Sequence, residues 1–102
     1  MERLQIDGER LYRSLLDLKE VGAYDDEATG LRGVRRIALT DADAEGRRLV
    51  VRWMREAGLT VAIDQIGNVY GERRGTQPDL APIMMGSHID SVATGGAFDR
   101  AL

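Results

Sequence analysis

The chain has 102 residues, of which 43% are hydrophobic and 30% are charged, a composition that is typical of one small soluble domain. Its net charge is −3, and no block of like charge stands out, which argues against nucleic acid as the main partner. We therefore interpret three arginine pairs as solvated surface: Arg35-Arg36, Arg47-Arg48 and Arg73-Arg74. The absence of cysteine excludes disulfides and thiolate metal sites. The absence of a long apolar run argues against a membrane span or a signal peptide, so we expect a cytoplasmic protein.

A first helix is predicted near the start of the chain. Leucines recur at helical spacing between Gly8 and about Val21. Asp7 stands where an N-cap is expected, and Gly22 stands where a helix stops. The stretch Ala23–Leu39 that follows has no sustained period and is predicted to be a long loop, which is uncommon unless it serves a site or is ordered by a larger protein.

A second helix is predicted from Thr40 to about Gly58. Thr40 with Asp43 forms a near capping box, in which aspartate replaces the usual glutamate, and Gly58 stands at the expected C-terminal stop. The apolar residues of this segment fall on one face: Leu49, Val50, Trp53, Met54 and Ala57. Because the helical neighbours of Trp53 are apolar, core packing is favoured for it over stacking on a ligand.

Strands are predicted in the second half of the chain. Leu59–Ile63 and Val69–Arg73 have extended patterns on either side of Gly67-Asn68, which predicts a hairpin. After a polar loop, Ile83–Met85 is a continuous apolar run of the kind found in strands covered on both faces. Two helices followed by three strands indicate the α/β class, with a sheet that is not complete.

His88 is the single histidine and follows the predicted buried strand, at the edge where open α/β sheets bind ligands. A lone histidine in such a position is more often structural. Asp90, however, lies two residues further on, so the two side chains share one face of an extended segment. Because metal-binding imidazoles commonly have their other ring nitrogen held by a carboxylate, the pair suggests a metal site without deciding it.

Asp99 follows a loop that contains Gly95-Gly96, and paired glycines let the backbone approach closely to whatever occupies a cleft. A histidine and a carboxylate suit Zn²⁺, Mn²⁺ or another divalent first-row ion. The alternative is an ordinary Gly-Gly turn with a solvated aspartate.

The string from Gly86 to Val92, Gly-Ser-His-Ile-Asp-Ser-Val, followed by Gly-Gly-Ala-Phe-Asp at residues 95–99, resembles a known metal motif. It is similar to the first metal motif of the N-carbamoyl-L-amino-acid hydrolases, β-ureidopropionases and allantoate amidohydrolases, a subfamily of the binuclear-zinc aminoacylase and carboxypeptidase metallohydrolases. Upstream features agree in order and spacing: Gly33-Val34-Arg35-Arg36, Thr40 with Asp43, Met54 before Gly58, and Asp64 with Gly67-Asn68.

The resemblance implies an amidohydrolase that acts on a small-molecule substrate, an N-carbamoyl-L-amino acid or an allantoate-like compound. It implies two divalent metal ions, zinc above all, with manganese or another first-row metal as alternatives. His88 would ligate one ion, Asp90 would be a catalytic residue that orients His88, and Asp99 would bridge both ions. Ions that share a water lower its pKa toward neutrality, so that it can attack an amide or ureido carbonyl.

The resemblance also implies that residues 1–102 are the amino-terminal part of a metallohydrolase catalytic domain, with two helices followed by strands of an incomplete mixed sheet. The general-base glutamate, the remaining ligands and a dimerisation or lid domain would lie downstream, the parent would be a homodimer, and this chain alone would be inactive. Arg100 stands where the subfamily usually has glycine. Two alternatives stay open: an aminopeptidase or aminoacylase of the wider family, and a non-catalytic pseudo-enzyme in which Arg100 occupies the metal pocket.

Overall fold

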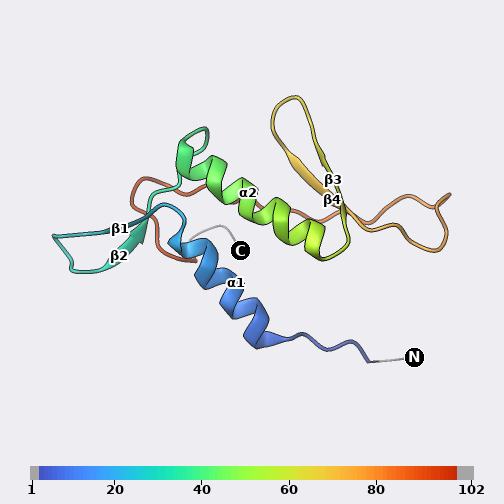
Figure 1. The fold of residues 1–102 in the computed structure, drawn as a ribbon, viewed down its shortest axis with the longest axis horizontal. Helices are drawn as coiled ribbons and strands as arrows, with labels where there is room; N and C mark the ends of the chain where they lie inside the picture. Colours follow the sequence, from blue (N-terminus) through green and yellow to red (C-terminus); the bar gives the residue numbers. More distant parts are fainter. Residues whose placement is uncertain (1–2, 99–102) are drawn as a thin grey trace.

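The computed structural model describes residues 3–98 (Figure 1). They contain two helices and four short strands, and the strands form two separate antiparallel sheets. The elements follow one another as α1 (Gly8–Glu20), β1 (Ala23–Asp25), β2 (Arg32–Val34), α2 (Asp41–Glu56), β3 (Thr60–Ile63) and β4 (Val69–Glu72). β1 pairs with β2, and β3 pairs with β4. The predicted α/β class is confirmed, with its described strands in two hairpins.

Both helices begin and end close to the residues that the sequence indicated. Asp7 accepts a backbone hydrogen bond at the start of α1 (3.1 Å), and Thr40 accepts one at the start of α2 (3.3 Å). In each case the side-chain oxygen accepts a hydrogen bond from an N–H group in the first turn, which has no carbonyl partner within the helix. Beyond the carboxyl ends, Gly22 and Gly58 both take a φ of 81°, a left-handed conformation that glycine adopts without a steric penalty.

We define the α2–hairpin unit as α2 together with β3 and β4, which lie beside it in Figure 1. In the hairpin, Ile63 is opposite Val69. Arg47 of α2 donates a hydrogen bond to the carbonyl of Gly67 in the turn (2.6 Å). Met54 packs against Gly71, where an added Cβ would lie 3.0 Å from the Met54 sulfur. The hairpin predicted from the sequence is therefore confirmed, and it packs on α2.

Asp64 organises the turn of that hairpin. Its carboxylate accepts hydrogen bonds from the side chain of Asn68 (2.8 Å), from the backbone N–H groups of Asn68 (2.8 Å) and Ile66 (3.1 Å), and from the Tyr70 hydroxyl (3.2 Å). These hydrogen bonds favour the ionised form of Asp64 and hold its pKa below the ordinary value. The hydrogen bond from the Asn68 side chain has the largest effect.

The prediction of a continuous loop over residues 23–39 is wrong, because β1 and β2 lie within it. The two strands have three residues each, which is too short for an alternating pattern to stand out in the sequence. Tyr24 faces Gly33 across the pair, and an added Cβ on Gly33 would lie 2.8 Å from the tyrosine ring. The close approach of ring and backbone explains the glycine.

The prediction of a buried strand at residues 83–85 is also wrong for the described structure. The segment is not a strand, and Ile83, Met84 and Met85 are 94%, 77% and 89% exposed. An apolar run becomes a strand only when a neighbouring strand supplies hydrogen-bond partners. Among residues 3–98, no strand pairs with this segment, so its apolar side chains stay uncovered.

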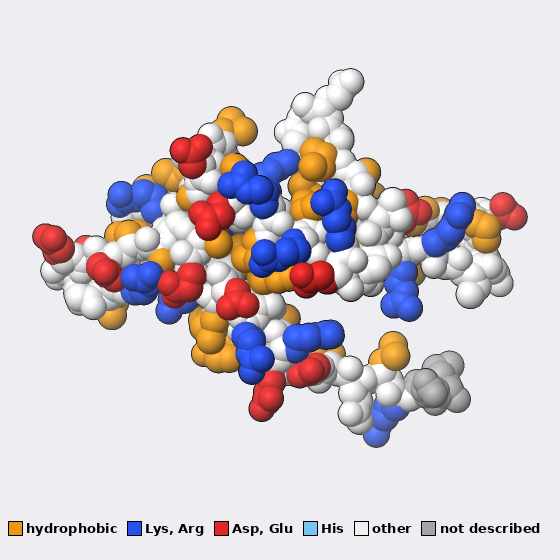
Figure 2. Space-filling view, in the orientation of Figure 1, with side chains coloured by type: hydrophobic (Ala, Val, Ile, Leu, Met, Phe, Trp, Pro, Cys, Tyr) orange, Lys and Arg blue, Asp and Glu red, His pale blue; other side chains and the backbone are white. Residues whose placement is uncertain are grey.

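The apolar core of the described residues is small. Its buried hydrophobic side chains are Val21 and Val34, and the apolar stripe of α1 stays open, with Leu11 51% and Tyr12 58% exposed. Figure 2 shows apolar side chains interspersed with basic and acidic ones on one face of the molecule. Across the part of the chain that the structure describes, neither helix has the length and apolarity that crossing a membrane requires.

Candidate metal centre

His88 and Asp90 lie together, as their spacing predicted. The Nδ1 atom of His88 is 2.9 Å from the Asp90 carboxylate and 3.1 Å from the Asp90 backbone carbonyl. Because both oxygens only accept hydrogen bonds, Nδ1 carries the ring proton and donates it. Nε2 then keeps the lone pair with which a neutral imidazole binds metal ions. The two side chains are 50% and 42% exposed, so an ion in solution can reach them.

The segment that carries this pair is held against the end of β2 and the two residues that follow it. Val34 and Gly95 exchange two backbone hydrogen bonds, of 2.8 and 3.1 Å. The Ser91 N–H donates to the carbonyl of Arg36 (2.7 Å), and the Arg36 N–H donates to the Ser91 hydroxyl oxygen (2.8 Å). We call this pairing of residues 34–36 with residues 89–95 the clamp. In Figure 1, it brings the red end of the described chain beside β2.

Arg36 is buried at the clamp, with 4% of its surface exposed, so the interpretation of all the arginine pairs as solvated surface is wrong for this residue. Its Nε donates to the carbonyl of Ile89 (2.7 Å). Its Nη1 donates to the carbonyls of Leu18 (2.9 Å) and Val21 (2.7 Å) at the carboxyl end of α1. Composition and charge did not reveal this role. The one available signal was the position of Arg36 in the Gly33–Arg36 segment that matched the resemblance.

The surroundings of Arg36 explain how its charge is accommodated. Burial lowers the pKa of the Arg36 guanidinium, whereas the carboxylates of Asp43 and Asp90 raise it. Gly46 of α2 provides the space, because an added Cβ at that position would lie 2.8 Å from Cδ of Arg36. The arginine therefore joins α1, α2 and the segment that carries His88.

The other predicted ligand, Asp99, lies outside the described residues, and so does Arg100. Within residues 3–98, no three His, Cys, Asp or Glu side chains gather in a group that could hold a metal ion. An imidazole whose Nδ1–H is held by a carboxylate nevertheless has the donor chemistry of a zinc ligand. The described part of the chain thus contains one imidazole of that type, with a carboxylate 2.9 Å from its Nδ1.

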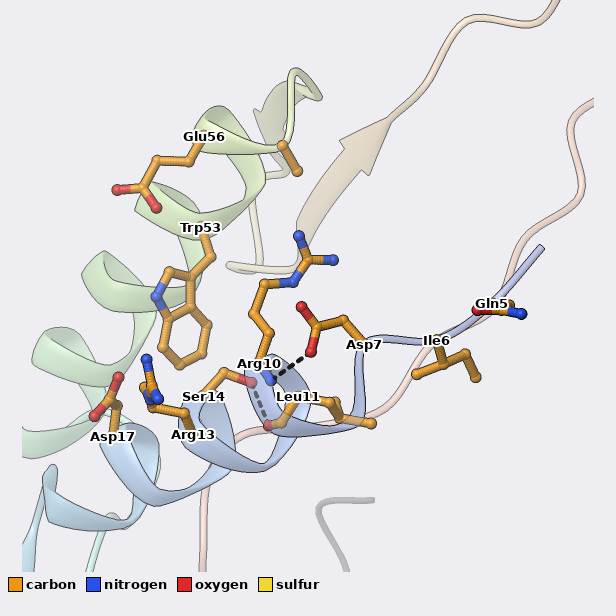
Figure 3. A pocket seen from close by; sticks show the side chains of 11 residues that line it. Gln5, Ile6, Asp7, Arg10, Leu11, Arg13, Ser14, Asp17, Trp53 and Glu56 are labelled. Atoms are coloured by element: carbon orange, nitrogen blue, oxygen red, sulfur yellow. Dashed lines mark hydrogen bonds between the residues drawn. The ribbon is translucent and has the colours of Figure 1, made fainter.

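A hollow of about 640 Å³ lies between the two helices, away from this pair (Figure 3). Leu11 and Ser14 of α1 line one side, and Trp53 and Glu56 of α2 line the other. Neither His88 nor Asp90 is among its lining residues. Trp53 is half-buried and its ring lines this hollow, so it does not lie in the described core of Val21 and Val34 that its predicted packing role would require.

Known proteins were found that resemble the chain along its whole length, although no family model matches it. An N-carbamoyl-L-amino-acid amidohydrolase from Pseudomonas sp. (strain NS671) is 46% identical over 102 residues, which are 100% of this chain and 23% of that protein. This chain is homologous to the N-carbamoyl-L-amino-acid amidohydrolases. A probable allantoate deiminase from Oryza sativa subsp. japonica is 34% identical over 108 residues, which cover 100% of this chain and 21% of the relative.

Solved structures agree with these amidohydrolase homologues. A hydantoinase/carbamoylase family amidase from Burkholderia ambifaria superposes with a TM-score of 0.86 at 46% identity, covering 97% of this chain and 23% of the amidase. The shared fold therefore includes nearly every residue of the chain. The chain spans less than a quarter of the length of the curated relatives that it matches.

Proposed function

We propose that this chain supplies the first metal-binding segment of a metal-dependent amidohydrolase. The reaction is hydrolysis of a linear C–N bond in an N-carbamoyl-L-amino acid or an allantoate-like ureido compound. The observation that carries the proposal is the 2.9 Å contact between His88 Nδ1 and the Asp90 carboxylate, in a segment held by the clamp. Homologues named for carbamoyl amino acids and for allantoate support the substrate class.

Each residue has a distinct part in this proposal. His88 holds one metal ion through Nε2, and Asp90 keeps the proton on Nδ1 and fixes the orientation of the ring. Asp99, which lies outside the described residues, would be a ligand shared by both ions. When they are bound, the ions, Zn²⁺ or Mn²⁺, polarise the substrate carbonyl and lower the pKa of the attacking water.

Coordination requirements limit what the isolated chain can do. Two ions that share Asp99 need further histidine and carboxylate ligands, and the chain has one histidine. In the proposed enzyme, the other ligands and the general base therefore come from residues outside this chain. We accordingly expect residues 1–102 alone to be inactive. The homodimer is expected from the family resemblance alone.

A chimera tests the function directly. Residues 1–102 replace the aligned part of the Pseudomonas relative, to which they are 46% identical. We expect the purified chimera to hold stoichiometric metal and to hydrolyse an N-carbamoyl-L-amino acid. Within it, His88→Ala and Asp99→Ala should remove metal and turnover, whereas Asp90→Asn should retain metal and lose about 10- to 100-fold in activity, as expected for a residue that acts through a ligand. Metal content and steady-state kinetics are the measurements.

The control is Asp79→Asn, which removes an exposed carboxylate in the polar loop and should change neither measurement. A folded chimera without metal or turnover would support the non-catalytic alternative instead. Hydrolysis of N-acyl amino acids or dipeptides, with none of N-carbamoyl amino acids, would favour an aminoacylase or aminopeptidase. Normal metal content and turnover in Asp99→Ala would show that the bridging role is wrongly assigned.

A further inference from the structure

We propose that Arg36 is a positioning residue for the metal centre. It holds the backbone on both sides of Asp90, so that the Asp90 carboxylate stays on Nδ1 of His88 and the ring proton stays off Nε2. The inference rests on the proposed function only in taking Nε2 as the atom that binds the metal. The evidence for this inference is the arrangement of the hydrogen-bonding groups around Arg36.

Three hydrogen bonds join Arg36 to the two neighbours of Asp90 in the chain. The Arg36 side chain binds the carbonyl of Ile89 (2.7 Å), which precedes Asp90. The backbone N–H and carbonyl of Arg36 bind the hydroxyl and N–H of Ser91, which follows it (2.8 and 2.7 Å). A backbone rotation that swung the Asp90 carboxylate away from His88 would break at least one of these bonds. Arg36 therefore fixes the backbone from which the Asp90 carboxylate reaches the imidazole.

The other end of the Arg36 side chain is anchored to a helix. Its Nη1 binds the carbonyl of Leu18, which also accepts the N–H of the C-cap residue Val21, and the carbonyl of Val21 itself. Both carbonyls lie at the end of α1 where the helix dipole is negative. The planar guanidinium presents five donors in a rigid fork, so it can bind carbonyls of α1 and of Ile89 at the same time. A lysine ammonium is a single point of charge on a flexible stem and cannot reproduce this geometry.

Electrostatics and packing support the same arrangement. The Asp90 carboxylate attracts the guanidinium, and Gly46 leaves space for its aliphatic stem. Arg36 is 4% exposed, whereas the His88 and Asp90 side chains are about half exposed. The pair that faces solvent thus rests on a buried support, which is how a binding site keeps its geometry while an ion enters and leaves.

The test uses the chain labelled with ¹⁵N-histidine, in which His88 is the single histidine and supplies the whole ring signal. At alkaline pH, where the ring is neutral, we expect Nδ1 of the unchanged chain to carry the proton. Arg36→Gln should raise the population with the proton on Nε2 several-fold, and Zn²⁺ affinity measured by calorimetry should fall by about 10-fold, the low end for residues that support a ligand. Arg36→Lys should give a tautomer population and a Zn²⁺ affinity between those of the unchanged chain and those of Arg36→Gln.

Two further variants separate positioning from a purely structural role. Ser91→Ala removes a clamp hydroxyl and leaves the contacts of Arg36 with α1, so it should shift the tautomer in the same direction as Arg36→Gln. Asp7→Ala removes the N-cap of α1 at its opposite end, so it should reduce helical circular dichroism and leave the His88 signal unchanged. If Arg36→Gln does not fold, Ser91→Ala decides alone.

An unchanged tautomer in every folded clamp variant would overturn the proposal. So would an equal shift in Asp7→Ala, because Arg36 would then act only by stabilising α1. Failure of the proposed function has a different signature, in which Nδ1 carries the proton in the unchanged chain, the clamp variants shift it, and the folded chimera holds no metal.

Discussion

The clamp and the α2–hairpin unit are stabilised in different ways. The α2–hairpin unit is continuous in the chain; a backbone ladder joins its strands, and the side chains of Met54 and Leu59 pack against Gly71. The clamp joins residues more than 50 positions apart through a few hydrogen bonds and one buried guanidinium. Removing one apolar contact weakens a packed face gradually, whereas removing one clamp partner leaves buried polar groups unsatisfied. Equal changes should therefore cost more at the clamp.

The largest expected difference concerns two glycines that share a φ of 81°, Gly22 beside the clamp and Gly58 after α2. An added Cβ at Gly22 would lie 2.8 Å from the Arg35 carbonyl oxygen, whereas at Gly58 it would meet no atom within 4 Å. Gly58→Ala should cost about 1 kcal/mol from backbone conformation alone. Gly22→Ala adds a backbone clash and should cost about 2–4 kcal/mol. Urea unfolding followed by circular dichroism gives both free energies, and equal costs would contradict the contrast.

Gly46→Ala should have an intermediate effect. An added methyl group would lie 2.8 Å from Cδ of Arg36, and that side chain cannot move aside because its donors are bound at both ends. Overpacking of about 1–3 kcal/mol should outweigh the gain of about 1 kcal/mol that alanine brings to a helix. The control is Gly8→Ala, in open space at the start of α1, which should be neutral or stabilising. A stabilised Gly46→Ala variant would show that Arg36 is less firmly held than its contacts indicate.

The smallest expected effect is a pH dependence confined to the α2–hairpin unit. The pKa of Asp64 is lower in the folded chain, chiefly because of the hydrogen bond from the Asn68 side chain. The ionised Asp64 side chain therefore stabilises the folded chain fully above the ordinary aspartate pKa of about 3.9. This stabilisation is lost as the pH falls through the lower pKa that Asp64 has in the folded chain. Exchange of the Asn68 amide, measured against pH, should accelerate there, and Asp64→Asn should flatten the profile. An Asp64→Asn profile that kept the same step would assign the effect to another group.

The difference between the regions has a functional meaning under the proposed function. A metal ligand must be reachable from solvent, and His88 is half exposed. Its geometry must also be fixed, and the clamp provides this from the buried side. The open apolar segments of α1 and of residues 83–85 should favour self-association of the isolated chain.

The sequence by itself determined the features whose causes are local. Asp7, Thr40, Gly22 and Gly58 mark the helix ends, because capping groups and left-handed residues act within a few positions of where they stand. The β3–β4 hairpin follows from two short extended runs around one turn. The His88–Asp90 contact follows from a spacing of two residues, so it was predictable without the fold. The roles of His88, Asp90 and Asp99 toward a metal stay predictions.

Only the tertiary structure decided features that depend on distant partners. Ile83–Met85 has the composition of a buried strand, yet a strand needs a neighbour, and within residues 3–98 none pairs with it. Arg35 and Arg36 are indistinguishable in a list of basic residues. Arg36 is 4% exposed because its side chain donates both to carbonyls at the end of α1 and to the carbonyl of Ile89. Within the described residues, Arg35 donates to the carbonyl of Ala93 (2.9 Å), has no side-chain bond to α1, and stays exposed. Burial of a charge depends on partners that chain folding brings together from far along the sequence, and no local pattern encodes their meeting.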